Sequence, residues 1–337
     1  MAALCSSPTI LLFHAEMVPP ITDSVDDEVR GSPPPIAPNG PLDFYSTFLS
    51  SRPPAFETCA IEKIISLAHL APKLQLHIVH LSAIECIPLL RDARERGIKI
   101  SAETCFHYLA IAAEDVATGD TRYKCCPPIR DATNRDGLWA ELSSPNSVIE
   151  SVVSDHSPCT PKLKLLPNHI LGSTSVEASE EDRGQDKGDF LTSWGGISSV
   201  GLGLSILWSS AHSGSGSGSW LSSSNNHITQ SQTPRISIVD IVKLCCVNTA
   251  IQVGLQHQKG SIAPGIDADI CVFDDKGSFV LEQAQMLYRN KVTPYQGKEL
   301  RGVVLETYLR GRSIYVRNVG FRDEAPRGKM LLEKRKC

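Results

Sequence analysis

An alternation of short apolar runs with helical segments constrains the fold of the first 156 residues more than any other feature. The apolar runs have the length of strands and are expected at 9–14, 74–80, 98–107 and within 147–156. Apolar residues recur at helical spacing between them, which predicts helices at 51–71, at 83–97 with Gly97 as its end, and around 134–143. Strands that alternate with helices indicate βα units and a parallel sheet.

The rest of the chain differs in composition and in apolar pattern. Two polar segments, an acidic one at 172–190 and a Ser/Gly-rich one at 209–234, enclose an ordered-looking segment at 192–208. The Ser/Gly-rich composition predicts a low-complexity insert without fixed structure. A helix is expected at 237–255, and short alternating strands with glycine turns follow at 259–274 and 300–316. We therefore expect an α/β domain at 1–255, a small β unit at 256–320 and a charged tail at 321–337.

Composition excludes several classes of function. The 337 residues carry a net charge of −4, so the chain lacks the basic character expected of a nucleic-acid-binding protein. No run of 18 apolar residues predicts a membrane span, and the first residues lack the basic start of a signal peptide. The eleven cysteines form no C-x-x-C pair, which favours reduced thiols in a cytoplasmic protein over a structural zinc site.

Three potential metal ligands stand where predicted strands end. Alternation along each strand places His14, His80 and Asp155 on the face of that strand's apolar residues, and His77 on the opposite face. The carboxyl ends of strands form the active-site face of a βα barrel, and two imidazoles with a carboxylate suit a divalent cation. The competing interpretation is that each is a packed or solvent-bonded residue at a strand end.

These residues lie in motifs that carry a family resemblance. The motifs are "LLFHAE", "YSTFLSSRPPAFETCAIEKII", "LHIVHLS", "ETCFHYL", "KCCPPIRD", "VVSDHSPC", "WGGISS", "KGSIAPGIDADICVFD" and "NKVTPYQGKELRGVVLETYLRG". Together they resemble the allantoinases, which are cyclic amidohydrolases of the dihydroorotase and hydantoinase group. The resemblance covers most of the chain outside the low-complexity insert, and it favours allantoinase over dihydroorotase.

The resemblance implies a metal-bearing (β/α)8 barrel, a small β-sandwich, and hydrolysis of allantoin to allantoate in purine breakdown. Family members hold two zinc ions with an H-x-H motif, a carbamylated lysine, two further histidines and an aspartate. By this resemblance His14 and His80 correspond to the ligands of the fifth and sixth strands. Asp155 corresponds to the ligand of the eighth strand and to the general base, which moves a proton while activated water attacks the ring amide.

The resemblance also suggests residues around the substrate. The segments "KCCPPIR" and "WGGI" are expected to position it through backbone groups, with Cys126, Pro127, Ser157 and Gly196 as the candidates.

Two further histidines are expected to act indirectly. His107 is expected to pack behind the pocket or to line it. His156 is expected to orient a neighbouring residue.

The sequence departs from the family pattern at its start. It contains no H-x-H, and the 13 residues before His14 are too few for four strands and their helices. We therefore expect the C-terminal half of the barrel, strands five to eight, with a remnant of the β-sandwich. At most one zinc ion and impaired activity are expected, because the H-x-H motif and the carbamylated lysine are missing.

Other interpretations stay open at this point. The chain could be a catalytically inactive fragment or a gene-prediction artefact that at most associates with an intact subunit. Its substrate could also be a hydantoin or a dihydropyrimidine in place of allantoin. A small-molecule ureide is the expected partner, and a homo-oligomer is compatible with the sequence.

Overall fold

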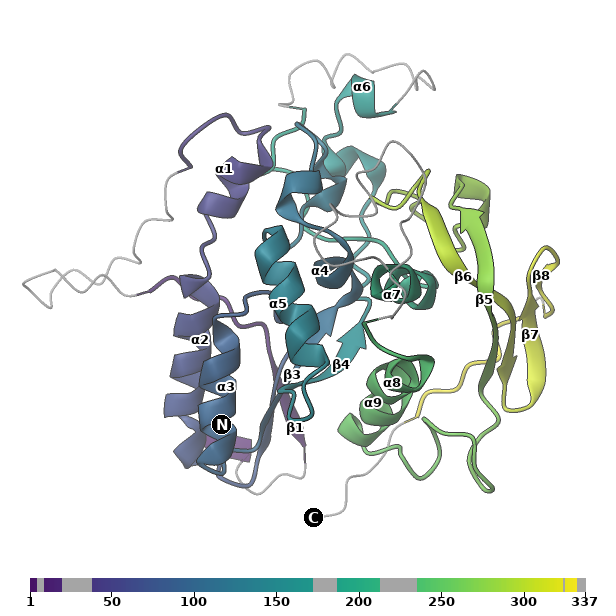
Figure 1. Cartoon of the computed structure of the whole chain (residues 1–337), viewed down its shortest axis with the longest axis horizontal. Coiled ribbons are helices and arrows are strands. Elements are labelled where there is room, and N and C mark those ends of the chain that lie inside the picture. The colour runs from purple at the N-terminus through teal and green to yellow at the C-terminus, as the bar shows by residue number, and fades with distance from the viewer. Residues whose placement is uncertain (5–8, 20–37, 172–186, 213–234, 324, 332–337) are drawn as a thin grey trace, which may run out of the picture.

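A four-stranded parallel sheet forms the centre of the computed structural model, which describes residues 1–4, 9–19, 38–171, 187–212, 235–323 and 325–331. Its strands follow chain order and are β1 (Ile10–Phe13), β2 (Gln75–Ile78), β3 (Ile100–Cys105) and β4 (Ile149–Val153). All three pairings are parallel, and β3 and β4 lie side by side near the centre of Figure 1. The predicted α/β architecture is confirmed, and each predicted strand contains one of these four.

The two faces of this sheet differ in polarity. Leu76 and Ile78 of β2 are buried, as expected for apolar side chains under helices. His77 faces the other way, where the register aligns it with Leu12 of β1 and Ser101 of β3. Its Nδ1 lies 2.7 Å from the Ser101 hydroxyl. The predicted orientation of His77, away from the apolar residues, is confirmed.

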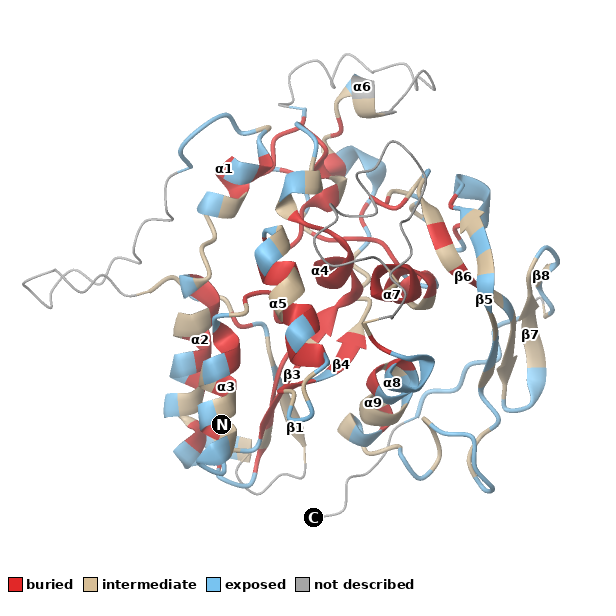
Figure 2. Cartoon of the chain, in the orientation of Figure 1, coloured by how far each residue is buried: buried red, intermediate tan, exposed pale blue. Residues whose placement is uncertain are grey.

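Helices follow the strands in the predicted order. The α-helices before the second polar segment are α1 (Tyr45–Ser50), α2 (Ala55–Ser66), α3 (Cys86–Glu95), α4 (Phe106–Ala110), α5 (Ala132–Leu142), α6 (Asn168–Leu171) and α7 (Gly203–Ala211). In α3, the buried residues Cys86, Leu90 and Ala93 recur at helical spacing. Gly97 has φ +82°, which suits its predicted place after the helix end. Figure 2 shows the buried sides of α2 and α3 turned inward.

The predicted helix at 237–255 is built in three parts. These are α8 (Ile238–Val242), a π-helical turn (Lys243–Val247) and α9 (Asn248–Gln252). Ser237 caps its start, because its hydroxyl accepts from the Asp240 amide while the Asp240 carboxylate accepts from the Ser237 amide. No helix within the described ranges combines the length and apolar character that crossing a membrane requires.

The second sheet is antiparallel and packs against α7. It contains β5 (Ile270–Val280), β6 (Glu299–Leu309), β7 (Arg312–Val316) and β8 (Gly320–Phe321) in chain order. Its first two strands are 11 residues each, longer than the short strands predicted, and their register shifts at bulges. The Ser205 hydroxyl of α7 donates to the Gly302 carbonyl of β6 at 2.7 Å, which joins the two units.

The structure describes only part of the two polar segments. Residues 209–211 of the predicted low-complexity insert are the last turn of α7. Residues 213–234 of that insert and 172–186 of the acidic segment lie outside the described residues, as do 332–337 of the predicted tail.

Candidate active site

The centre of the candidate site is a pair of histidines at the carboxyl edge of the parallel sheet. His14 follows β1 directly, and His80 lies two residues beyond the end of β2. Nδ1 of His14 is 2.9 Å from Nε2 of His80, and the two rings meet edge to face with centroids 4.7 Å apart. His14 is exposed and His80 is partly buried, so the pair lies at an open rim.

Strand alternation does not explain how this pair forms. The β1–β2 register aligns Leu12 with His77, so alternation alone would direct His14 and His80 to opposite faces of the sheet. β2 ends at Ile78, and His80 has φ +40°, which takes the chain out of the extended conformation. Asp155 likewise has φ +42°, beyond the end of β4 at Val153. The expectation that His80 and Asp155 continue the alternation of their strands is therefore wrong. Their predicted positions at strand ends are confirmed.

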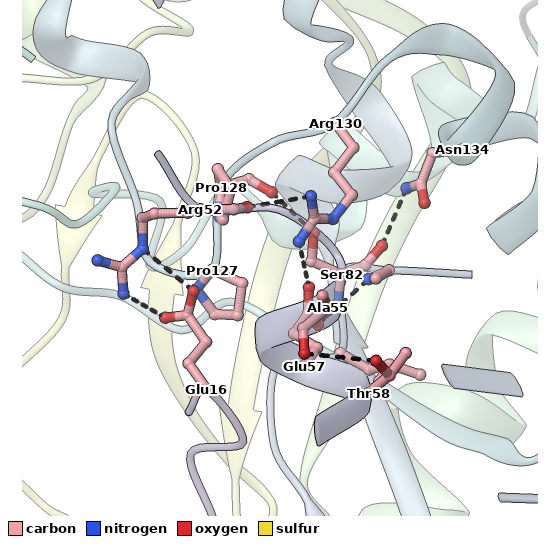
Figure 3. A network of polar contacts seen from close by, with 12 residues as sticks. Glu16, Arg52, Ala55, Glu57, Thr58, Ser82, Pro127, Pro128, Arg130 and Asn134 are labelled. Carbon is pink, nitrogen blue, oxygen red and sulfur yellow. Dashed lines mark hydrogen bonds and ion pairs between the residues drawn. The ribbon is translucent and has the colours of Figure 1, made fainter. Parts of the chain in front are cut away.

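A carboxylate that sequence analysis missed lies behind His14. Glu16 Oε2 is 3.1 Å from His14 Nε2, on the opposite side of the ring from His80. Arg52 donates two hydrogen bonds to the same carboxylate, at 3.1 and 2.6 Å, as Figure 3 shows. Burial raises the pKa of Glu16, but the hydrogen bonds from His14 and Arg52 outweigh it and lower the pKa overall. An ionised carboxylate here fixes the orientation of the His14 ring.

Asp155 lies at the rim and acts on the histidine pair through its charge. Its side chain is exposed. Burial and the neighbouring His14 lower the pKa of His80, and the negative charge of Asp155 opposes this shift. A neutral imidazole is the form that binds metal ions.

The donor set of the pair fits a divalent cation. Two imidazole ligands of one tetrahedral zinc, at about 2.0–2.1 Å from the metal, lie about 3.3 Å apart, so the pair would need to open only slightly. Within the described ranges, however, no three His, Cys, Asp or Glu side chains are already placed to hold one metal ion. The structure thus brings His14 and His80 together but does not close the predicted three-ligand set with Asp155.

His107 is buried close to this pair. It is the second residue of α4 and is 1% exposed. Neither of its ring nitrogens has a hydrogen-bond partner among the described residues. Burial, with a smaller contribution from His80, lowers the pKa of His107 to about 3. Its ring packs edge to face on Tyr108, 4.3 Å between centroids. A packed neutral imidazole behind the site is compatible with the predicted supporting role, which stays a prediction.

His156 holds the segment that follows residue 196. Its Nδ1 accepts hydrogen bonds from the Ser199 amide at 3.0 Å and the Val200 amide at 3.1 Å. A bridge to Ile197 joins the two segments as parallel neighbours. This geometry supports the prediction that His156 orients neighbouring residues.

The predicted substrate loops contact each other. A Cβ on Gly196 would lie 2.6 Å from the Ser157 carbonyl oxygen, so only glycine allows this approach. The Gly196 amide donates to the Lys124 carbonyl at 2.8 Å, and the Cys126 thiol lies against Gly195.

A tyrosine hydroxyl holds the adjoining proline. The Pro127 carbonyl accepts from the Tyr108 hydroxyl at 2.7 Å. Cys126, Pro127, Ser157 and Gly196 are thus neighbours in space, and their contacts with substrate stay predictions.

A buried ion pair supports the loop that carries His80. Glu57 of α2 accepts from the amides of Ser82 and Ala83 at 2.9 and 3.2 Å, and from Arg130 at 2.7 Å (Figure 3). Both charged side chains are nearly fully buried. Burial raises the pKa of Glu57, while Arg130 and the two amides work in the other direction. Through this pair, α2 connects the segment after β2 with the segment that follows Pro127.

Comparison with known proteins shows which proteins this chain resembles. The model of the amidohydrolase family matches residues 209–314. The chain is 41% identical to the allantoinase of Saccharomyces cerevisiae over 338 residues, and 37% identical to a probable allantoinase of Dictyostelium discoideum over 310 residues. The chain is thus similar to allantoinases over its described length, and to the amidohydrolase family model over residues 209–314.

Solved structures of similar proteins agree with the fold. A D-hydantoinase structure matches with a TM-score of 0.62 and 29% identity, covering 81% of this chain. The dihydropyrimidinase of Brevibacillus agri matches with a TM-score of 0.62 and 26% identity, covering 83% of this chain. The predicted half of an amidohydrolase barrel with a small β unit is consistent with these neighbours.

The chain spans only part of the length of these family members. It covers 61% of the yeast protein, 52% of the Dictyostelium protein and 51% of the D-hydantoinase chain.

Proposed function

We propose that the site acts in the hydrolysis of a cyclic amide, with allantoin as substrate and allantoate as product. The observation that carries the proposal is the histidine pair at the carboxyl edge of the sheet. Nδ1 of His14 and Nε2 of His80 are 2.9 Å apart there. Similarity to proteins named allantoinase supports the choice of a ureide.

His14, His80 and Asp155 would hold one zinc ion in this proposal. When bound, such an ion lowers the pKa of water and polarises a carbonyl. Glu16 keeps the His14 ring in orientation, and burial favours the neutral imidazole of His80. The exposed carboxylate of Asp155 accepts a proton from water and returns it to the leaving ring nitrogen.

The substrate would lie against the loops beside the pair. Cys126, Pro127, Ser157 and Gly196 lie where the backbones of these loops approach each other closely. A ureide ring carries several N–H donors and carbonyl acceptors, which backbone groups of these loops would orient. This argument supports any planar cyclic amide, and specificity for allantoin rests on the similarity to allantoinases.

One other proposal is favoured by a specific observation. The solved structures that match are a hydantoinase and a dihydropyrimidinase, which favours hydantoins or dihydropyrimidines as alternative substrates. A catalytically inactive chain that at most associates with an intact subunit stays the alternative prediction. A cytoplasmic location and a homo-oligomer stay predictions.

One experiment separates these proposals. The purified chain is loaded with zinc and assayed with allantoin, hydantoin and dihydrouracil, with Asp155→Asn as the matched control. Slow release of allantoate that is lost in D155N is the expected result. Faster turnover of either other ring would reassign the substrate. If no ring is opened while the chain binds an intact allantoinase, the catalytic proposal is wrong.

A further inference from the structure

A buried lysine ties together two segments that adjoin the candidate site. Lys164 lies in the segment after β4 and is 3% exposed. Its ammonium donates to the carbonyls of Gly196 at 2.6 Å and Trp194 at 3.1 Å. It also lies 3.2 Å from the Thr121 carbonyl and 3.4 Å from the Lys124 carbonyl. One charged group thus contacts two carbonyls of each segment.

The partners of Lys164 are unusual for a buried charge. Within the described ranges it forms no ion pair, and its four hydrogen-bond partners are all backbone carbonyls. Burial lowers the pKa of Lys164 to about 8. Removing a cation from water is costly unless it is well hydrogen-bonded, so the four carbonyls are what keep the charge in place.

The two segments connected in this way are the predicted substrate loops. Residues 121–124 lead directly into Cys126 and Pro127, and residues 194–196 end at the close contact between Gly196 and Ser157. The Thr121 hydroxyl donates back to the Lys164 carbonyl, so the contact is reciprocal.

A second lysine strengthens the connection. The Lys124 ammonium donates to the carbonyls of Leu191 at 2.8 Å and Ser193 at 2.5 Å. The Gly196 amide donates to the Lys124 carbonyl at 2.8 Å. Lys164 and Lys124 therefore connect the same two segments.

We infer that Lys164 is a positioning residue that fixes the loops around Cys126 and Gly196 relative to each other. The inference rests on the proposed function only where it takes these loops as the wall of a substrate site. The contacts themselves, and the test below, need neither metal nor substrate.

Hydrogen exchange in the full chain tests this inference. Lys164→Met removes the donors at similar length, Lys164→Gln keeps two N–H donors without charge, and Lys162→Met is the control on an exposed lysine two residues earlier. We expect K164M to raise exchange of the Gly196 and Ser157 amides at least about tenfold, while amides of β2 and β3 stay unchanged. K164Q should give a smaller increase and K162M none.

Alkylation of Cys126 gives a second, independent measurement. The Cys126 thiol is partly buried against Gly195, whereas Cys246 is exposed and serves as the internal reference. Peptide mapping after brief iodoacetamide treatment should show faster labelling of Cys126, relative to Cys246, in K164M. Unchanged exchange and labelling in K164M would overturn the inference, as would a uniform rise across the parallel sheet. If K164M does not fold, K164Q decides by the same two measurements.

Discussion

His80 and Asp155 have the same left-handed backbone conformation, with φ of +40° and +42°. Each lies two residues beyond the last residue of a parallel strand, at the edge where the candidate site lies. Residues with a Cβ rarely adopt this conformation, and such strain is concentrated at functional sites. The two proposed ligands therefore share a strained backbone conformation at matching positions beyond their strands.

The strain at Asp155 is measurable by substitution. Asp155→Gly and Asp155→Ala remove the same carboxylate, but only glycine adopts a positive φ without a steric cost. We expect D155G to be more stable to urea than D155A by about 1 kcal/mol. The control is exposed Asp92 in α3, where D92G should be less stable than D92A by about the same amount. The same sign at both positions would show that Asp155 is not strained.

Glu16 should tune metal binding without being a ligand. The Glu16→Gln substitution keeps the shape of the side chain but weakens its hold on the His14 ring, whose Nε2 lies 3.1 Å away. We expect zinc affinity, measured by calorimetric titration, to fall about 10- to 100-fold. Glu150→Gln, which changes an exposed carboxylate paired with Arg94, should leave it unchanged. Equal affinities for E16Q and wild type would exclude this orienting role.

The buried Glu57–Arg130 pair should be important for stability. The Glu57→Gln substitution leaves the Arg130 guanidinium buried with its main charged partner removed. We expect the free energy of unfolding in urea to fall by about 3 kcal/mol or more. Asp92→Asn in α3 breaks an exposed pair with Arg96, which follows the helix, and should cost less than about 1 kcal/mol. A loss as small for E57Q as for D92N would contradict the packing described for this pair.

His107 should make the fold sensitive to acid. Burial lowers its pKa from 6.5 to about 3, so between these values the unfolded chain binds one more proton than the folded chain. Stability from this group is therefore present above pH 6.5 and is lost as the pH falls toward 3. The slope is up to about 1.4 kcal/mol per pH unit.

The measurement is urea unfolding of His107→Phe across this pH range. H107F should lose this part of the pH dependence. The neighbouring control Tyr108→Phe, which removes a hydrogen bond to Pro127, should lower stability by about 1 kcal/mol equally at each pH. Parallel pH profiles for wild type and H107F would show that His107 does not stay neutral in the folded chain.

Sequence patterns predicted the scaffold of the site better than its interior. The four parallel strands and the face of α3 followed from apolar spacing, and the strand-end positions of His14 and His80 followed from the strands. Alternation applies only inside a strand, so it gave the wrong direction for His80, which lies after β2.

Contacts between segments that are distant in the sequence could hardly be predicted from local sequence patterns. Glu16 and Arg52 are 36 residues apart, and neither belongs to a periodic pattern that would pair them. Lys164 lies between Leu163 and Leu165, and nothing in this local pattern marks it as buried, because its burial depends on two loops that fold over it. The spacing in "LLFHAE", with a carboxylate two residues after His14, was the one signal that could have indicated Glu16.

Titration with cobalt(II) tests the central claim, that His14 and His80 bind one metal ion together, most directly. The full chain is titrated while the visible absorption of the bound ion is followed, with His14→Ala, His80→Ala and the surface control His69→Ala in parallel. We predict one cobalt ion per chain in wild type and H69A, and an affinity at least about 100-fold lower in H14A and in H80A. No binding by wild type, or binding that both site variants retain, would contradict the account.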